Sequence, residues 1–271
     1  MTTTIAPHPV TRRNTVLGFV TGAGVGGLGG LIGLGGAEFR LPLLIGLFRF
    51  GPLEAVILNK ALSLVVVASA LVFRTKVVPL GMVADHWPVI VNLLAGSLAG
   101  AWFGAGWATR LKSSTLYRVI AVMLVGIALV LLFAHHPNSV GHPLLIGWAQ
   151  VVAGVAAGFG IGIVAAVLGV AGGELLIPTL VLLFGLDIKL AGSLSLAVSL
   201  PTMITGFARY SRDGSFSVLG DNARFFTVMA VGSVIGGFVG AMLLGVVPTA
   251  VLLPALGAIL LISAVKVWRH R

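Results

Sequence analysis

Four charged side chains lie in or beside apolar segments of the sequence: Glu38, Arg40, Lys60 and Glu174. The free energy of membrane insertion is unfavourable by about 2.5 to 3.5 kcal/mol for an aspartate, lysine or arginine at the centre of a membrane helix. We therefore expect these groups to face a cavity or a charge partner, or to be neutral. If Glu38 and Glu174 meet in a low dielectric they cannot both ionise cheaply, which makes them candidate proton carriers.

Other roles for the charged groups stay open. Each glutamate could instead cap the unpaired N–H groups at the start of its own short helix. Arg40 is a possible charge partner. For Lys60 the alternatives are contact with an anion or carboxylate, and snorkelling of the amine to the end of its segment.

Small polar side chains accompany these charges. Ser63, Ser195 and Ser199 are candidates for a polar pathway, although a serine in a helix is expected to bond to its own backbone. Lys60 follows Asn59, whereas the corresponding residues of the second half of the chain are Ser195 and Leu196. A buried cation is therefore expected in one half only.

Both glutamates lie in glycine- and proline-rich stretches, "GLGGAEFRLP" (residues 33–42) and "GVAGGELLIP" (residues 169–178). Backbone that leaves helical geometry at membrane depth is tolerated only beside protein or a water-filled cavity. Paired interruptions of this kind point to a transporter binding site near the bilayer midplane. Two helix N-termini there would favour an anionic ligand. The glycines that we expect to form this site are Gly33, Gly35, Gly36, Gly169, Gly172 and Gly173.

The composition places the chain in a membrane. Of its 271 residues 58% are hydrophobic and 9% are charged, and the mean hydropathy is +1.12, whereas soluble domains carry about 25% charged residues. The net charge of +10 is assigned to loops that face anionic lipid, and not to nucleic acid. The absence of cysteine excludes disulfides and thiolate metal sites.

The two halves of the chain are a duplication. A shift of 136 residues aligns them without a gap and makes nine glycines coincide, where chance predicts about three. Glu38 then matches Glu174 and Ser63 matches Ser199. Further glycines, in the series of Gly22, Gly96 and Gly232, are spaced for close helix packing.

Each half contains five apolar segments. They cover residues 14–34, 38–48, 54–73, 87–109 and 115–133 in the first half, and 147–170, 174–184, 190–208, 223–245 and 249–267 in the second. The second segment of each set is too short to span a bilayer alone. The predicted fold is an all-α integral membrane protein with two inverted-topology repeats, whose second segments are broken or re-entrant helices. The predicted parts are a cytoplasmic tail (1–13), repeat 1 (14–134), a linker (135–146) and repeat 2 (147–271).

The distribution of lysine and arginine sets the orientation. If all five segments of each half change sides, both termini are cytoplasmic, and the outside retains chiefly Arg74, Lys76 and Lys189. Four crossings per half would move Arg110, Lys112 and Arg118 outward, which the charge bias disfavours. With five crossings per half, the basic residues on the cytoplasmic side are Arg12, Arg13, Arg49, Arg110, Lys112, Arg118, Arg209, Arg212, Arg224, Lys266, Arg269 and Arg271.

No pattern in the sequence favours an enzyme, a metal site or a cofactor. The histidines of the central linker lack neighbouring acids, and no serine, histidine and acid constellation lies within the apolar segments. Three functions stay open: a secondary carrier for a small anion, an anion channel, and a membrane scaffold that does not transport. The membrane lipid and the substrate are the expected partners, protons are a further candidate, and a homo-oligomer is compatible with the sequence.

The repeated motif resembles the TauE/SafE family of sulfite and organosulfonate exporters. The resemblance rests on "GLGGAEFRLPLLIGLF" followed by "LNKALSLVVVAS", and on "GVAGGELLIPTLVLLFGLDIKLAGSLSLAVS" in the second half. It covers nearly the whole chain, and Arg40 and Lys60 depart from the pattern. It implies export of a small sulfur-containing anion (sulfite, a sulfonate or an organosulfonate) across the bacterial inner membrane, driven by an ion gradient.

Overall fold

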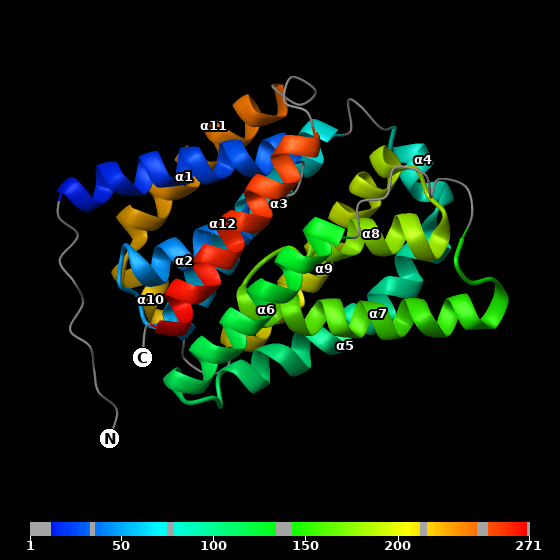
Figure 1. Ribbon diagram of the computed structural model, residues 1–271, viewed down its shortest axis with the longest axis horizontal. Coiled ribbons are helices and arrows are strands. Elements are labelled where there is room, and N and C mark those ends of the chain that lie inside the picture. Colours follow the sequence, from blue (N-terminus) through cyan, green and yellow to red (C-terminus); the bar gives the residue numbers. More distant parts are fainter. Residues whose placement is uncertain are drawn as a thin grey trace.

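The computed structural model describes residues 12–32, 36–74, 79–133, 143–211, 216–242 and 249–269. Every regular element within these ranges is an α-helix (Figure 1). The helices that match predicted segments are α1 (Arg12–Ile32), α2 (Ala37–Gly46), α3 (Pro52–Arg74), α5 (Trp87–Ala108), α6 (Ser113–Phe133), α7 (Gly147–Leu168), α8 (Gly173–Phe184), α9 (Ile188–Ser211), α11 (Ala223–Met242) and α12 (Thr249–Arg269). The all-α prediction is confirmed.

Two short helices were not predicted. They are α4 (Leu80–Asp85) and α10 (Ser217–Asp221), each just before a long helix. A shift of 136 residues in the sequence aligns the last residue of α4 with that of α10, both aspartates. The same shift aligns the bounds of the longer helices to within a few residues. The repeat in the sequence is therefore also a repeat of helices.

The long helices are suited to a membrane. Within α3, α5, α7, α9 and α11, stretches of 18 to 22 residues are long and apolar enough to cross one. By contrast α2 has 10 residues and α8 has 12, so the second segment of each half is short, as predicted. The chain is a multi-pass membrane protein.

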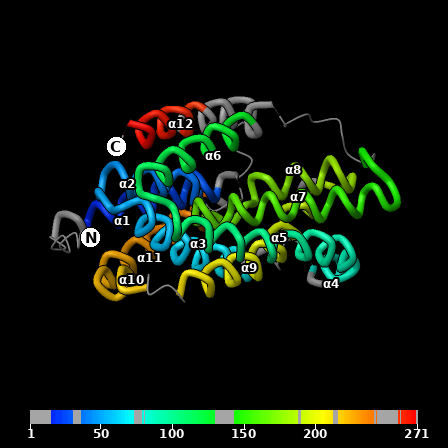
Figure 2. Tube along the Cα trace, turned by 90° about the horizontal axis from the view of Figure 1, so that it is seen from below, coloured from blue at the N-terminus to red at the C-terminus, as the bar shows by residue number. Residues whose placement is uncertain are grey.

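Helices pair mainly between the two repeats. The most extensive contacts join α1 to α11 and α5 to α7, and equivalent helices touch each other in the pairs α3 with α9 and α6 with α12. This exchange of partners is what a twofold relation between the halves produces. In Figures 1 and 2, α6 and α12 lie side by side and run in opposite directions, as equivalent helices of an inverted repeat would.

Glycines allow the closest of these contacts, as predicted. A Cβ at Gly100 of α5 would overlap the carbonyl oxygen of Phe159 in α7, and one at Gly26 of α1 would overlap that of Ser233 in α11. Similar overlaps would occur at Gly22, Gly96, Gly158, Gly162, Gly232, Gly236 and Gly240. These glycines are packing residues, because the helix backbones approach too closely for any side chain.

The short helix α8 returns toward the start of α7. Nε2 of Gln150, in the first turn of α7, donates to the carbonyl of Leu183 at 2.8 Å, and the Leu144 N–H donates to the carbonyl of Leu182 at 3.0 Å. The two helices therefore form an antiparallel hairpin, with the interruption at its tip. Such a reversal counts α8 as a segment of its own direction, and five segments of alternating direction per repeat are what the predicted inverted topology requires.

Candidate functional site

Glycines with positive φ form the interruptions. Gly169 ends α7 with φ 66°, and Gly172 precedes α8 with φ 80°. Gly36 occupies the same position before α2, with φ 67°. Only glycine adopts this left-handed backbone without strain. The predicted Gly33 and Gly35 lie outside the described residues, and Gly173 is the first residue of α8.

Each of the two short helices contains a proline. Pro42 and Pro178 are each the sixth residue of their helix, not within its first turn, and both helices continue past them. Each missing N–H leaves one carbonyl of the preceding turn without its helical partner. The short helices are thus weakened next to the interruptions.

The structure brings Glu38 and Glu174 together. Each is the second residue of its short helix, and each is buried. The two carboxyl groups lie within hydrogen-bonding reach of one another. Ionised carboxylates only accept hydrogen bonds, so a bond between them requires a proton on one.

Little else in the described chain satisfies these carboxyl groups. No described group forms a well-aligned hydrogen bond to any of the four oxygens, and neither helix has a side-chain cap. Apart from the other carboxyl, each carboxyl lies beside the backbone N–H of its own residue. The predicted alternative, capping, is at most local here, whereas the contact between the two carboxyls joins the repeats.

Arg40 is buried among neutral groups. Its Nε donates to Oδ1 of Asn59 at 2.8 Å, and its Nη2 donates to Oγ of Ser63 at 2.8 Å. Nη1 donates to Oγ of Ser233 in α11 at 3.2 Å. Among the described residues no carboxylate forms an ion pair with Arg40, although Glu38 lies near enough to interact with its charge. Two of the five guanidinium N–H groups are left for another acceptor.

Asn59 connects the two interruptions. Its Nδ2 donates to the carbonyls of Ala37, at the start of α2, and Leu168, at the end of α7, both at 3.0 Å. Oγ of Ser63 lies 2.7 Å from the carbonyl of Asn59 and 3.2 Å from that of Gly169, as alternative acceptors for its single proton. Asn59 was not among the residues predicted to form the site. Its only signal was an amide inside an apolar segment, next to Lys60.

Lys60 contacts the C-terminal end of α7. Its amine is buried and donates to the carbonyl of Ala165 at 3.1 Å. Gly206 of α9 leaves room for it, because a Cβ there would lie 2.9 Å from Cε and Nζ. A cation is favourable beside these last carbonyls of a helix. In the described structure the amine of Lys60 thus neither contacts a carboxylate nor extends to the end of its own helix, α3.

The second repeat lacks these cations. Leu176 stands at the position equivalent to Arg40, and Leu196 at that of Lys60. Oγ of Ser199 donates to the carbonyl of Ala171 in the interruption at 2.7 Å, whereas Oγ of Ser195 donates within its own helix to Gly192 at 2.9 Å. The site is therefore symmetric in its backbone and carboxyls but asymmetric in its positive charge.

The arrangement can bind an anion and hold a proton. Two buried cations and the starts of two short helices provide positive potential, while the carboxyl pair is a place for a proton. Among the described residues no group of histidine, aspartate and glutamate side chains is placed to hold a metal ion.

Comparison with known proteins gives one result. The family model described as sulfite exporter TauE/SafE matches residues 3–131 and 153–271, one match in each repeat. No significant match was found among curated proteins or solved structures. The family match covers nearly the whole chain and agrees with the helical membrane fold, so the chain belongs to the sulfite exporter TauE/SafE family.

Proposed function

We propose that this protein exports a small sulfur-containing anion (sulfite, a sulfonate or an organosulfonate) across the bacterial inner membrane by alternating access. The family match supports a transporter of sulfur anions. The observation that carries the proposal is the buried site at the paired helix interruptions, where two cations form no ion pair with a carboxylate of the described residues. An oxyanion offers the acceptors and the charge that they lack.

The proposed anion site uses side chains of the first repeat and backbone of both. Arg40 and Lys60 supply charge, and Ser63 and Ser199 supply hydroxyl groups beside the interruptions. We assign Gly36, Gly169, Gly172 and Gly173 to the backbone of the pathway, and Ser195 to its margin. A buried cation is costly without a counter-charge, so a bound anion would offset that cost.

Proton coupling is proposed for the carboxyl pair. When the proton is lost, the two negative charges repel each other at short range in a low dielectric. Movement of the two short helices apart would relieve that repulsion, because Glu38 is on α2 and Glu174 on α8. Protonation would thus bias which arrangement of the two repeats is stable, as alternating access requires.

The proposed topology is inverted, with both termini in the cytoplasm. The antiparallel course of α6 and α12 (Figure 2) supports the inversion. The hairpin of α7 and α8 supports an odd number of segments of alternating direction in each repeat. The excess of lysine and arginine on one side supports the cytoplasmic assignment.

Reconstituted transport tests this proposal. Proteoliposomes are preloaded with unlabelled sulfite, taurine or sulfoacetate, and the entry of the same labelled anion is followed with and without a pH gradient. A carrier gives saturable counterflow that rises with the preloaded anion, whereas a channel shows no such stimulation. Absence of counterflow for every sulfur anion would overturn the proposal.

A further inference from the structure

A basic and aromatic cluster lies on the surface where α5 and α9 end. The guanidinium carbon of Arg209 lies 5.6 Å from the centroid of the Trp102 ring, a cation–π contact. One turn further along α5, Gly106 leaves room for the same guanidinium, because a Cβ there would lie 3.2 Å from its Nε. Arg209 is therefore held against the side of α5 by an aromatic ring and a missing side chain.

Arg110 extends this surface. It follows the last turn of α5, where its N–H donates to the carbonyl of Trp107 at 3.0 Å, and its side chain is exposed. Trp102 and Gly106 are four residues apart, so they share one face of α5. Arg110 follows after four more residues, just beyond the end of the helix. Trp102 is 39% exposed, which suits a ring at the boundary between lipid tails and headgroups.

Two more exposed cations lie next along the chain, and the one acid described beside them accepts a hydrogen bond from the backbone. Lys112 and Arg118, before and within the start of α6, are both exposed. Glu54 lies near the Tyr117 hydroxyl and accepts a hydrogen bond from the N–H of Gly51 at 3.0 Å. The cluster therefore presents a local excess of positive charge.

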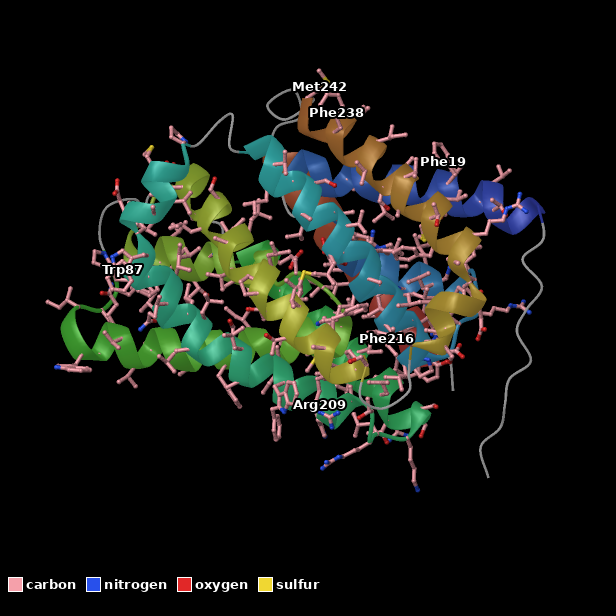
Figure 3. All side chains as sticks on the ribbon, turned by 180° about the vertical axis from the view of Figure 1, so that it is seen from behind. Phe19, Trp87, Arg209, Phe216, Phe238 and Met242 are labelled. Carbon is pink, nitrogen blue, oxygen red and sulfur yellow. The ribbon has the colours of Figure 1, made fainter. Side chains whose placement is uncertain are left out.

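The duplication provides an internal comparison at the other end of the molecule. Figure 3 shows Phe238 and Met242 at one end and Arg209 at the opposite end. Phe238 and Met242 are the repeat equivalents of Trp102 and Gly106, and they are 46% and 71% exposed. The residues equivalent to Arg209 and Arg110 are Phe73 and Val246. The repeat-equivalent positions in the sequence thus carry basic residues in one case and apolar residues in the other.

We propose that Arg209, Trp102 and Arg110 bind the phosphate headgroup of an anionic phospholipid. Guanidinium groups bind phosphate oxygens through paired hydrogen bonds, and the tryptophan packs beside the upper part of the acyl chains. This lipid site is separate from the buried anion site and does not depend on the transport proposal.

Lipid titration of the full-length protein tests the site. Protein purified in a neutral detergent is titrated with phosphatidylglycerol or phosphatidylcholine, and bound lipid is counted by native mass spectrometry. Each cation near a membrane surface contributes about a fivefold increase in anionic lipid affinity. Arg209→Gln and Arg110→Gln should each weaken phosphatidylglycerol binding by about that factor, and Arg110 lies in an exposed turn where its loss leaves the packing intact.

The matched control is Arg224→Gln. Arg224 is an exposed cation at the start of α11, a helix that packs mainly against α1, α3 and α10 rather than against α5 or α9. Its loss changes the net charge equally but should leave lipid binding within about twofold, because screening limits the effect of a surface charge outside the cluster. The proposal fails if Arg224→Gln weakens binding as much as Arg110→Gln, or if phosphatidylcholine binds as tightly as phosphatidylglycerol. It also fails if free glycerol phosphate displaces the lipid at equal concentration, because the site would then take a soluble phosphate.

Discussion

The carboxyl groups of Glu38 and Glu174 meet within hydrogen-bonding reach, one at the start of α2 and the other at the start of α8. No other well-aligned donor in the described chain serves them. A proton shared between them would link the two repeats directly. The central claim of the proposed mechanism is that this proton takes part in transport.

The first prediction concerns the carboxyl pair itself. Glu38→Gln and Glu174→Gln keep the shape of each side chain and supply a permanent donor, so both variants should fold. In each variant the glutamine cannot release a proton and the remaining carboxyl no longer faces a second negative charge, so a pH gradient should change the rate of anion flux in proteoliposomes much less than in the unmodified protein. Glu54→Gln, at a half-buried acid in the first turn of α3, is the control and should keep its response. A full response in both buried variants would leave the carboxyls a purely structural role.

A second prediction uses the repeat to choose a substitution. Lys60→Leu introduces the residue that the second repeat carries at this position, Leu196. Replacing a buried charge by an apolar group of similar volume is often neutral or stabilising, so thermal unfolding in detergent should be unchanged or shifted upward. Anion flux should fall at least about tenfold, because a charged contact to the substrate is worth about 1.5 to 3 kcal/mol. Unchanged flux would restrict Lys60 to its contact with the end of α7.

Asn59 carries the third prediction. Asn59→Leu removes the acceptor for Nε of Arg40 and the donor to two buried carbonyls, which should cost about 3 to 5 kcal/mol. Asn92→Leu removes one hydrogen bond, to the carbonyl of Val151, and should cost about 1 kcal/mol. Helix content during thermal unfolding measures both variants. Equal losses would mean that the Asn59 network adds nothing beyond an ordinary hydrogen bond.

Neighbouring glycines of α7 give the fourth prediction. A Cβ at Gly162 would overlap the carbonyl oxygen of Ser97, whereas one at Gly160 would meet nothing within 4 Å. Gly162→Ala should therefore prevent folding or cost more than about 2 kcal/mol, and Gly160→Ala should be neutral or stabilise the helix by up to about 1 kcal/mol. Yield of folded protein and thermal unfolding distinguish them. If both variants unfold alike, the helix backbones of α5 and α7 do not approach each other as closely as described.

The helices were largely predictable from the sequence because their signals are local. Apolar length gave the spans, and the glycine matches gave the repeat, so the predicted segments agree with the helix bounds to within a few residues. The short helices α4 and α10 were missed because five or six residues carry too little periodicity. The coincidence of Asp85 with Asp221 was their only signal.

The site was predictable only in part. Glu38, Glu174 and Arg40 were found because charge in an apolar segment is costly, and that cost is visible in one sequence. The contacts of Arg40 with Ser233 and of Lys60 with Ala165 were not found, since these partners come from the other repeat, more than 100 residues away along the chain. Such contacts depend on how the two repeats pack, which the sequence of either one does not reveal.

Proton movement during anion flux tests the central claim most directly. The sulfur anion with the largest counterflow is driven across proteoliposomes with the membrane potential clamped at zero, and an entrapped dye reports internal pH. A sulfonate is preferred, because it does not itself titrate near neutral pH. We predict that flux through the unmodified protein moves protons, and that flux through a Glu38→Gln, Glu174→Gln double variant moves none. Anion flux without proton movement in the unmodified protein, or equal proton movement in the double variant, would contradict the mechanism.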